Sequence, residues 1–367
     1  MTNLTNDYFV KYIELSLSCF EGNEKNLARK KKVSMQDIAE KLQISKNAVS
    51  LALQNKKGVS DELRLQVMNT AKQLGYGQFA EKDSIVSNIL VIVPERIMSY
   101  QDNDHFQFFH DMIWGLEKSI RKQGLNAVIT PIDQEMEDSL ILPGVFRDIP
   151  YHGVVLFGIV SKDYARLIWE MDIPLVILDS YYRDLPCPVV TSSNIEGACE
   201  AVSYLITEGH RDIGFIGPTN LTTSHEERWF GYWLAMQNHG LSINDSFCLK
   251  YSDGFHDTEK EIAAFLDGLV DMPTAFFCGN DRIAYILSQQ LRLRNLWVPN
   301  DVSVAGFDDL HYVEEAGLKM TTMRVEKGKI CDAAASLLLS ITDRNRETVR
   351  VYVPPTLIVR ESVKRVQ

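Results

Sequence analysis

The chain has 367 residues, too many for one ordinary domain and enough for a small domain beside two larger lobes. Its hydrophobic content of 45% indicates well-formed cores, and its formal net charge of −11 argues by itself against a nucleic-acid partner. No stretch approaches the length of a membrane span, and Asp7, Lys11 and Glu14 interrupt the first apolar run. We therefore do not expect an exported or membrane-embedded protein.

Cysteine usage argues against a metal site. Six cysteines are scattered along the chain without a Cys-x-x-Cys pair or a Cys/His cluster. This pattern predicts reduced, buried thiols in a cytoplasmic protein, and neither a metal nor a cofactor is expected. The glycines at 214 and 217 are too few for a dinucleotide-binding fingerprint.

The charges are unevenly distributed. Residues 24–58 contain nine lysines or arginines against three acids, so the rest of the chain is strongly acidic. A basic segment on an acidic body is typical of a phosphate-seeking module joined to a soluble sensor. A merely solvated charged surface is the alternative.

Residues 1–32 form an N-terminal extension. Asp7 is a candidate cap for an amphipathic helix that carries Tyr8, Tyr12 and Phe20, ahead of a basic arm at residues 29–32. This arm could follow a DNA backbone or a minor groove, and a disordered leader is the alternative.

Three short helices are predicted between Val33 and Tyr76. Helical spacing places one helix over residues 34–41, a second over 46–54 after the N-cap Ser45, and a third from Leu63 to Leu74. Helix, short turn and capped helix is the helix-turn-helix arrangement, in which the second helix offers its first turn to the major groove. The side chains so offered are Lys46, Asn47 and Ser50. An ordinary helical pair is the alternative for the first two helices alone.

From residue 87 onward, short apolar runs alternate with amphipathic segments, which is typical of βα units around parallel sheets. A first series has predicted strands at 89–93, 127–129, 154–157 and 175–178 and helices at 108–123, 163–171 and 194–208. A second series has strands at 213–216, 248–251, 275–278 and 302–305 and helices at 227–239, 257–269 and 282–294. Two doubly wound lobes that face one cleft follow from this pattern.

Polar residues directly after predicted strands are candidate ligands of a small molecule, because the ends of parallel strands line such a cleft. Asp179, Asn280, Asp281 and Asp308 occupy such positions. Ser224 and Arg228 lie one turn apart at a helix start, where a guanidinium gives paired donors for hydroxyls or a carboxylate.

Structural roles compete with these assignments. Asp281 and Asp309 could instead cap the helices that follow them, and Arg228 could form an ordinary ion pair. Phe108 and Phe109 open a helix, where one of them could line the cleft or pack in the core.

The motifs together resemble one known family. The head contains Asp37-Ile38-Ala39, Ile44-Ser45, Val49-Ser50, Gly58-Val59-Ser60 and Leu74-Gly75-Tyr76. The body contains Gly115-Leu116-Glu117, Asn194 to Ala198, Gly209-His210-Arg211, Arg228 with Gly231-Tyr232, Asn280-Asp281, Val298 to Asp309, Thr321-Thr322 and Leu357 to Ser362. In this order and spacing they resemble the lactose-repressor (LacI/GalR) family of bacterial transcription regulators over residues 33–362.

The resemblance implies a helix-turn-helix head on a two-lobed, periplasmic-binding-protein-like α/β body that binds an operator and a small effector, most often a sugar, as a homodimer. By position, the implied DNA-binding residues are Ser45, Lys46, Asn47, Ser50, Leu51, Lys56 and Tyr76. The implied effector-binding residues are Phe108, Asp179, Ser224, Arg228, Phe255, Asn280 and Asp308. The alignment at Phe255 is loose because of an extra residue near it.

The chain departs from the family pattern in the head and the linker. Gln43 stands where the turn usually has Gly, which costs about 1 kcal/mol if a left-handed backbone is kept. Ala48 replaces Thr, and Leu51 replaces an Arg that would contact guanine, so we expect an unusual operator. Residues 77–85 lack the Pro and Ala-Arg of the family's minor-groove hinge helix and carry two acids.

We therefore expect an extension at 1–32, a DNA-binding head at 33–78, a linker at 79–86 and an effector-binding, dimerising body at 87–363. The alternative from another class is a solute-binding protein or a sugar-processing enzyme on the same lobes. No nucleophile–base pair is recognisable in the sequence, so no catalytic residue is predicted.

Overall fold

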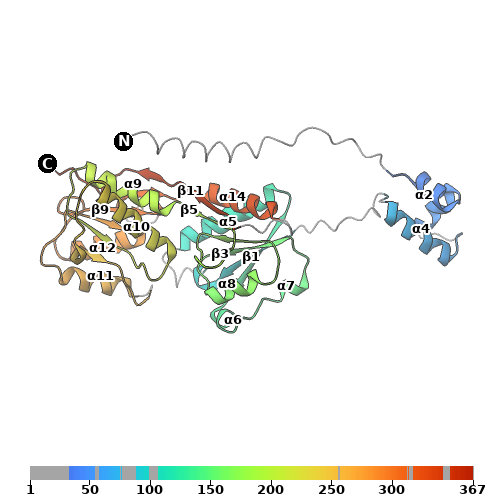
Figure 1. The fold of residues 1–367 in the computed structure, drawn as a ribbon, viewed down its shortest axis with the longest axis horizontal. Helices are drawn as coiled ribbons and strands as arrows, with labels where there is room; N and C mark the ends of the chain where they lie inside the picture. Colours follow the sequence, from blue (N-terminus) through green and yellow to red (C-terminus); the bar gives the residue numbers. More distant parts are fainter. Residues whose placement is uncertain are drawn as a thin grey trace. The chain divides into compact units, whose positions relative to one another are not determined.

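A computed structural model describes residues 33–53, 58–74, 76, 88–98, 106–254, 257–311, 313, 317–341 and 348–366. The chain divides into two compact units, Met1–Ile85 and Val86–Gln367. Figure 1 shows the helical head and the α/β body, which are described separately.

The head contains the three predicted helices, α2 (Met35–Leu42), α3 (Lys46–Leu53) and α4 (Asp61–Leu74). They close a small core whose buried members are Ile38, Ala39, Val49, Ala52, Val67 and Ala71. Ser34 is the N-cap of α2, and its backbone N–H donates to Asp37 Oδ2 at 2.7 Å. Gln43 ends α2 in the left-handed conformation, with φ 55°, so the strain expected from its replacing Gly is present.

Lobe 1 of the body is built on a six-stranded parallel sheet with the order β11-β5-β4-β3-β1-β2. Its strands are β1 (Asn88–Pro94), β2 (Asn126–Ile132), β3 (Gly153–Phe157), β4 (Leu175–Leu178), β5 (Val189–Ser192) and β11 (Arg350–Val353). Its helices are α5 (Phe106–Lys122), α6 (Gln134–Asp138), α7 (Val145–Asp148), α8 (Lys162–Trp169) and α14 (Lys327–Ser340). Helices α5 and α14 pack together over one face of the sheet, and α8 packs on the other.

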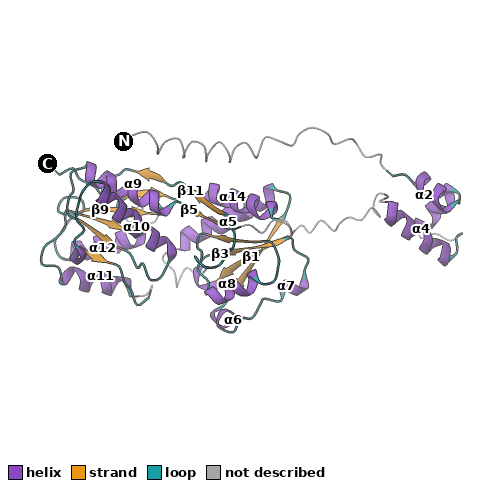
Figure 2. Cartoon of the chain, viewed as in Figure 1, coloured by secondary structure: helices purple, strands orange, loops and turns teal. Residues whose placement is uncertain are grey.

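Lobe 2 repeats this architecture with the order β12-β10-β9-β8-β6-β7, in which only β12 is antiparallel to its neighbour. Its strands are β6 (Ile213–Ile216), β7 (Cys248–Leu249), β8 (Ala275–Cys278), β9 (Ser303–Phe307), β10 (Thr321–Arg324) and β12 (Thr356–Ile358). Its helices are α9 (Asn194–Thr207), α10 (Thr223–Asn238), α11 (Thr258–Asp267) and α12 (Asp281–Leu293). Figure 2 shows the strands of both lobes between helical layers, and the predicted fold class is confirmed.

The chain crosses between the lobes three times, which the two successive series of the sequence analysis did not predict. The crossings lie between β5 and α9, between β10 and α14, and between β11 and β12. Helix α9, which the sequence analysis placed in the first series, packs against α10 in lobe 2. A hydrogen bond joins two of the crossings. Thr356 Oγ1, at the start of β12, donates at 2.9 Å to Oε1 of Glu326, which lies between β10 and α14.

None of the helices that the structure describes is both long and apolar enough to cross a bilayer.

Candidate effector site and DNA-reading helix

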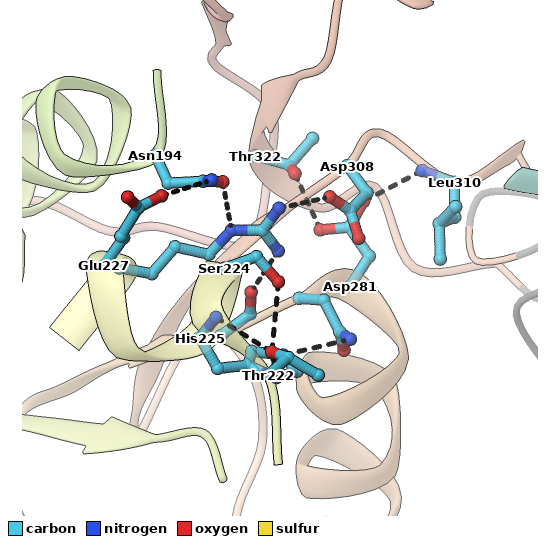
Figure 3. A network of polar contacts seen from close by, with 12 residues as sticks. Asn194, Thr222, Ser224, His225, Glu227, Asp281, Asp308, Leu310 and Thr322 are labelled. Carbon is cyan, nitrogen blue, oxygen red and sulfur yellow. Dashed lines mark hydrogen bonds and ion pairs between the residues drawn. The ribbon is translucent and has the colours of Figure 1, made fainter. Parts of the chain in front are cut away.

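The first turns of α10 carry most of the polar residues of the candidate effector site. Thr222 is the N-cap, and its hydroxyl accepts from the backbone N–H of His225 at 3.0 Å. The same hydroxyl lies 3.0 Å from Ser224 Oγ, so the cap fixes both side chains (Figure 3). Because residues four apart share one face of a helix, Ser224 and Arg228 lie along the same side of α10.

Arg228 is buried, and its guanidinium joins three segments of lobe 2. Its Nε donates to Asn194 Oδ1 at 3.0 Å, and its Nη2 donates to Asp308 Oδ1 at 3.0 Å. Its Nη1 donates to the carbonyl oxygen of Gly279 at 2.6 Å. The guanidinium carbon lies 3.7 Å from the centroid of the Phe307 ring, so the cation is stacked as well as hydrogen-bonded.

Glu227 extends this network into lobe 1. One of its oxygens accepts from Asn194 Nδ2 at 2.9 Å, and the other accepts from the hydroxyl of Tyr181, which follows β4 (Figure 3 shows the Asn194 contact). The Glu227 carboxylate and the Tyr181 ring are both buried, at 3% exposure each. A chain of hydrogen bonds therefore runs from lobe 1 through Glu227 and Asn194 to Arg228.

Two aspartates leave their strands in left-handed backbone conformations, Asp179 with φ 71° after β4 and Asp308 with φ 104° after β9. Burial, and to a smaller extent repulsion by Asp308, raise the pKa of Asp179 to about 7, although the positive charge of Arg228 partly opposes them. The segment after β4 also contacts lobe 2 directly, because the carbonyl oxygen of Tyr181 accepts from Thr223 Oγ1 at 2.9 Å.

Asn280 and Asp281 have separate structural roles at the start of α12. Asn280 is the N-cap, with its Oδ1 accepting from Ile283 N at 2.9 Å and its Nδ2 lying 3.3 Å from His225 Nε2. Asp281 is buried and accepts from Thr322 Oγ1 at 2.6 Å and from the backbone N–H of Leu310 at 2.9 Å (Figure 3). Burial raises its pKa to about 8 despite these hydrogen bonds.

The alternative that Asp281 caps a helix is wrong, because the N-cap of α12 is Asn280. Asp309 takes part in ion pairs. Asp309 pairs with Arg324 at 2.6 Å and with Arg360 at 2.8 Å. Burial opposes ionisation, but these two arginines hold the pKa of Asp309 below its ordinary value. The ion-pair alternative for Arg228 describes its contact with Asp308 correctly, and the same contact brings Arg228 to the end of β9.

The structure brings together five of the seven predicted effector residues, namely Asp179, Ser224, Arg228, Asn280 and Asp308. Phe108 lies in the apolar core at 3% exposure, which favours the packing alternative. Phe255 lies outside the described residues. The sequence analysis did not predict Tyr181, Glu227, Asn194 or Phe307 in this network, although the last two stand inside motifs that it quoted.

Five of the seven predicted DNA-contacting residues lie on α3 or directly before it. Ser45, Lys46 and Asn47 are exposed, and Ser45 Oγ accepts from the backbone N–H of Ala48 at 3.1 Å. Ser50 and Leu51 are half-buried. Tyr76 packs against the head core, and Lys56 lies outside the described residues. Helix α3 thus presents a basic and an amide side chain together at its start.

Within the described part of the chain, no group of three or more histidines, cysteines, aspartates or glutamates has the geometry to hold a metal ion.

Two family models match this chain. Residues 34–77 match the model for bacterial regulatory proteins of the lacI family, and residues 202–363 match the model for a periplasmic binding protein-like domain. The first matched segment contains α3, and the second contains Arg228.

Two curated relatives match over most of their own length. The chain is 28% identical over 338 residues to the probable HTH-type transcriptional repressor ExuR of Bacillus subtilis, which covers 91% of this chain and 99% of the relative. It is 28% identical over 318 residues to the HTH-type transcriptional repressor CytR of Escherichia coli K12, which covers 83% and 89%.

Solved structures share the fold. A complex of the transcriptional regulator CelR with cellobiose has a TM-score of 0.66 at 23% identity and covers 90% of this chain and all of that one. The lac repressor dimer bound to operator and the anti-inducer ONPF has a TM-score of 0.64 at 17% identity and covers 91% and 100%. The head of this chain therefore belongs to the lacI family of bacterial regulatory proteins, and the chain as a whole has the organisation of a DNA-binding transcriptional repressor.

Proposed function

We propose that a small sugar or sugar derivative binds beside Arg228 and changes the affinity of the repressor for its operator. In this proposal the head at residues 33–78 reads DNA, residues 79–86 connect it to the body, and the body at 87–363 binds the effector and forms a homodimer. The effector contacts are Asp179 from lobe 1 and Ser224, Arg228, Asn280 and Asp308 from lobe 2.

One observation carries the proposal, which is that Arg228 pairs with Asp308 where β9 of lobe 2 ends, while the segment after β4 of lobe 1, which begins with Asp179, contacts the helix that carries Arg228. Ligands of open α/β sheets bind at the carboxyl ends of the strands. A sugar needs both donors and acceptors for its hydroxyls, and carboxylates, an amide, a hydroxyl and a guanidinium supply both. The guanidinium has five N–H donors, of which the contacts described above use three.

Structures with the same fold support a sugar as the chemical class. One is the CelR complex with cellobiose, and another is a LacI-family regulator from Enterococcus faecium with bound ribose, at 22% identity and a TM-score of 0.62. The effector acts by binding unequally to the states with high and low operator affinity, since a ligand with equal affinity for both would shift nothing.

The test compares two arginine variants of the full-length protein. Cellobiose, ribose and a set of phosphorylated sugars are first screened by thermal shift, and each hit is then titrated by calorimetry. Arg228→Lys keeps the charge but loses the planar set of donors, so we expect the heat of binding and the operator response to be lost while operator affinity persists.

The matched control is Arg324→Lys, because Arg324 also pairs with a lobe 2 aspartate but is half-exposed and contacts Asp309 instead of Asp308. It should bind sugar as the wild type does. An Arg228→Lys protein with an unchanged sugar isotherm would remove Arg228 from the site. A wild-type protein that responds to no sugar would contradict the proposed effector class.

A further inference from the structure

We propose that Tyr181 and Glu227 form a latch between the lobes, and that Glu227 also positions Arg228 through Asn194. The inference rests on the proposed function, since it gives the effector site a mechanical link to lobe closure. Glu227 is a positioning residue in this scheme, and the effector touches Arg228 rather than Glu227.

The latch is defined by contacts between the segment after β4 and the start of α10. The Tyr181 hydroxyl donates to Glu227, and the Tyr181 carbonyl oxygen accepts from Thr223 Oγ1 at 2.9 Å. Arg183 adds a more exposed ion pair with Glu226 at 2.6 Å. The first two contacts carry the latch, because an exposed pair contributes little to stability.

Lobe 1 holds the Tyr181 ring in place from the other side. The Arg350 guanidinium, from β11, lies 4.5 Å from the centroid of this ring and donates to the carbonyl oxygen of Arg183 at 3.4 Å. Tyr181 therefore moves with lobe 1, and Glu227 moves with lobe 2. Opening of the lobes must separate the hydroxyl from the carboxylate.

The Asn194 amide transmits the effect of this separation, because its hydrogen bonds allow only one orientation of its nitrogen and oxygen. Its nitrogen donates to Glu227 and its oxygen accepts from Arg228 Nε, so a flipped amide would turn a donor toward a donor. When Tyr181 leaves, Glu227 is a buried carboxylate that has lost a donor and must find another partner. Its movement releases Asn194 and with it the orientation of Arg228. Lobe closure and assembly of the effector site are thus one coupled step.

Neighbouring tyrosines provide a matched pair of variants. Tyr181→Phe removes the hydroxyl that reaches lobe 2, whereas Tyr182→Phe removes a hydroxyl that donates to the Val160 carbonyl within lobe 1. Glu227→Gln is the conservative variant, since its amide can still accept from Asn194 and donate to the Tyr181 oxygen. Glu227→Leu removes both contacts.

The primary measurement is hydrogen exchange of the ligand-free, full-length protein, followed by mass spectrometry of peptides over residues 178–185 and 222–230. Tyr181→Phe and Glu227→Leu should speed exchange in both peptides by about tenfold, the effect of losing one hydrogen bond to a charged acceptor. Tyr182→Phe and Glu227→Gln should leave exchange in residues 222–230 at the wild-type rate. Equal acceleration by Tyr181→Phe and Tyr182→Phe would overturn the latch.

Sugar titration separates this inference from the proposed function. Any sugar that binds the wild type should bind Tyr181→Phe about tenfold more weakly and Tyr182→Phe unchanged. Equal affinity for both variants would overturn the coupling to Arg228. If no sugar binds the wild type, the proposed effector class fails, and the exchange comparison still decides whether the latch exists.

Discussion

Gly306 lies against the buried carboxylate of Asp281 near the end of β9. A Cβ atom at this position would meet Asp281 Oδ1 at 2.0 Å. The carboxylate cannot withdraw, because Thr322 and the backbone of Leu310 hold both of its oxygens. The absence of a side chain at residue 306 is therefore a requirement of the packing at this site.

The first prediction follows from this contact. Gly306→Ala should lower the free energy of unfolding by about 1 to 3 kcal/mol, as overpacking does in a rigid core. Urea denaturation of the full-length protein measures the effect. Gly328→Ala is the control, since a Cβ at residue 328 in α14 meets nothing within 4 Å. Equal stability of the two variants would show that the carboxylate can move.

The second prediction concerns Asp179 and pH. Its folded pKa of about 7 lies above the unfolded value of 3.8, so the folded state binds the proton more tightly. The stability that this proton contributes is present at low pH and is lost as pH rises toward 7. Asp179→Asn removes this dependence and suits the left-handed backbone.

Urea denaturation at pH 5 and pH 8 tests this pH dependence. Between these values, the stability of Asp179→Asn relative to wild type should rise by at least about 1 kcal/mol. A difference between the two proteins that stays constant with pH would contradict the raised pKa.

Position along the chain was enough to predict part of the candidate effector site. Asp179 and Asp308 directly follow strands, and Arg228 follows a helix start, so position along the chain was enough to nominate them. Tyr181 and Glu227 were not predictable in this way, because nothing in either local sequence indicates that the two elements meet across the lobes. Phe108 was predicted as a possible ligand but lies in the core. The local sequence could not decide between the two, because an aromatic residue at a helix start looks the same in either place.

At the scale of elements, we expect α3 to determine the base specificity of the head. Lys46 and Asn47 are both exposed on its first turn, but a lysine is a flexible point charge and an asparagine makes paired hydrogen bonds to adenine. Leu51 is half-buried and offers only apolar contact, for which a thymine methyl is the matching group.

The third prediction is that Asn47→Ala relaxes base choice at one position of the operator, at a cost of about 1 to 3 kcal/mol on the preferred sequence. Selection from a randomised DNA library, followed by titration of the selected sites, measures both effects. Gln66→Ala on the exposed surface of α4 is the control and should leave base choice unchanged. Unaltered base preferences in Asn47→Ala would exclude Asn47 from base reading.

Capped helices and buried apolar strands were predictable, and the strands beside the crossings between the lobes were not. The predicted bounds of α2 and α3 agree with the structure to within one residue, because caps and an apolar stripe mark them. Strands β5, β10, β11 and β12 have three or four residues each, and the sequence analysis assigned none of them. All four adjoin a crossing between the lobes, where the partner strand is distant in sequence and no local periodicity indicates it.

At the scale of the whole molecule, the two compact units carry opposite charge. The basic segment at 24–58 belongs to the first unit, and the acidic remainder lies mostly in the second. Phosphate contacts by basic residues supply most nonspecific DNA affinity, so this affinity should depend on the first unit alone.

The fourth prediction tests this division by deleting residues 1–78. The remaining body should lose DNA binding even at low ionic strength, because it keeps none of the basic residues of the segment at 24–58 and has a net negative charge. It should retain the sugar response of the full-length protein. Electrophoretic mobility shifts and calorimetry measure the two properties, and DNA retention by the truncated body would contradict the assignment.

The three crossings also determine when the protein can fold during synthesis. Strand β5 pairs with β11, and β10 pairs with β12. Both of these partner strands lie in the last part of the chain and are therefore synthesised last. A nascent chain on the ribosome consequently carries two incomplete sheets with open edges until translation is almost finished. Such edges are sites of aggregation. A premature stop before residue 350 would leave both lobes unfinished, so even a short truncation at this end should yield insoluble protein rather than a weakened repressor.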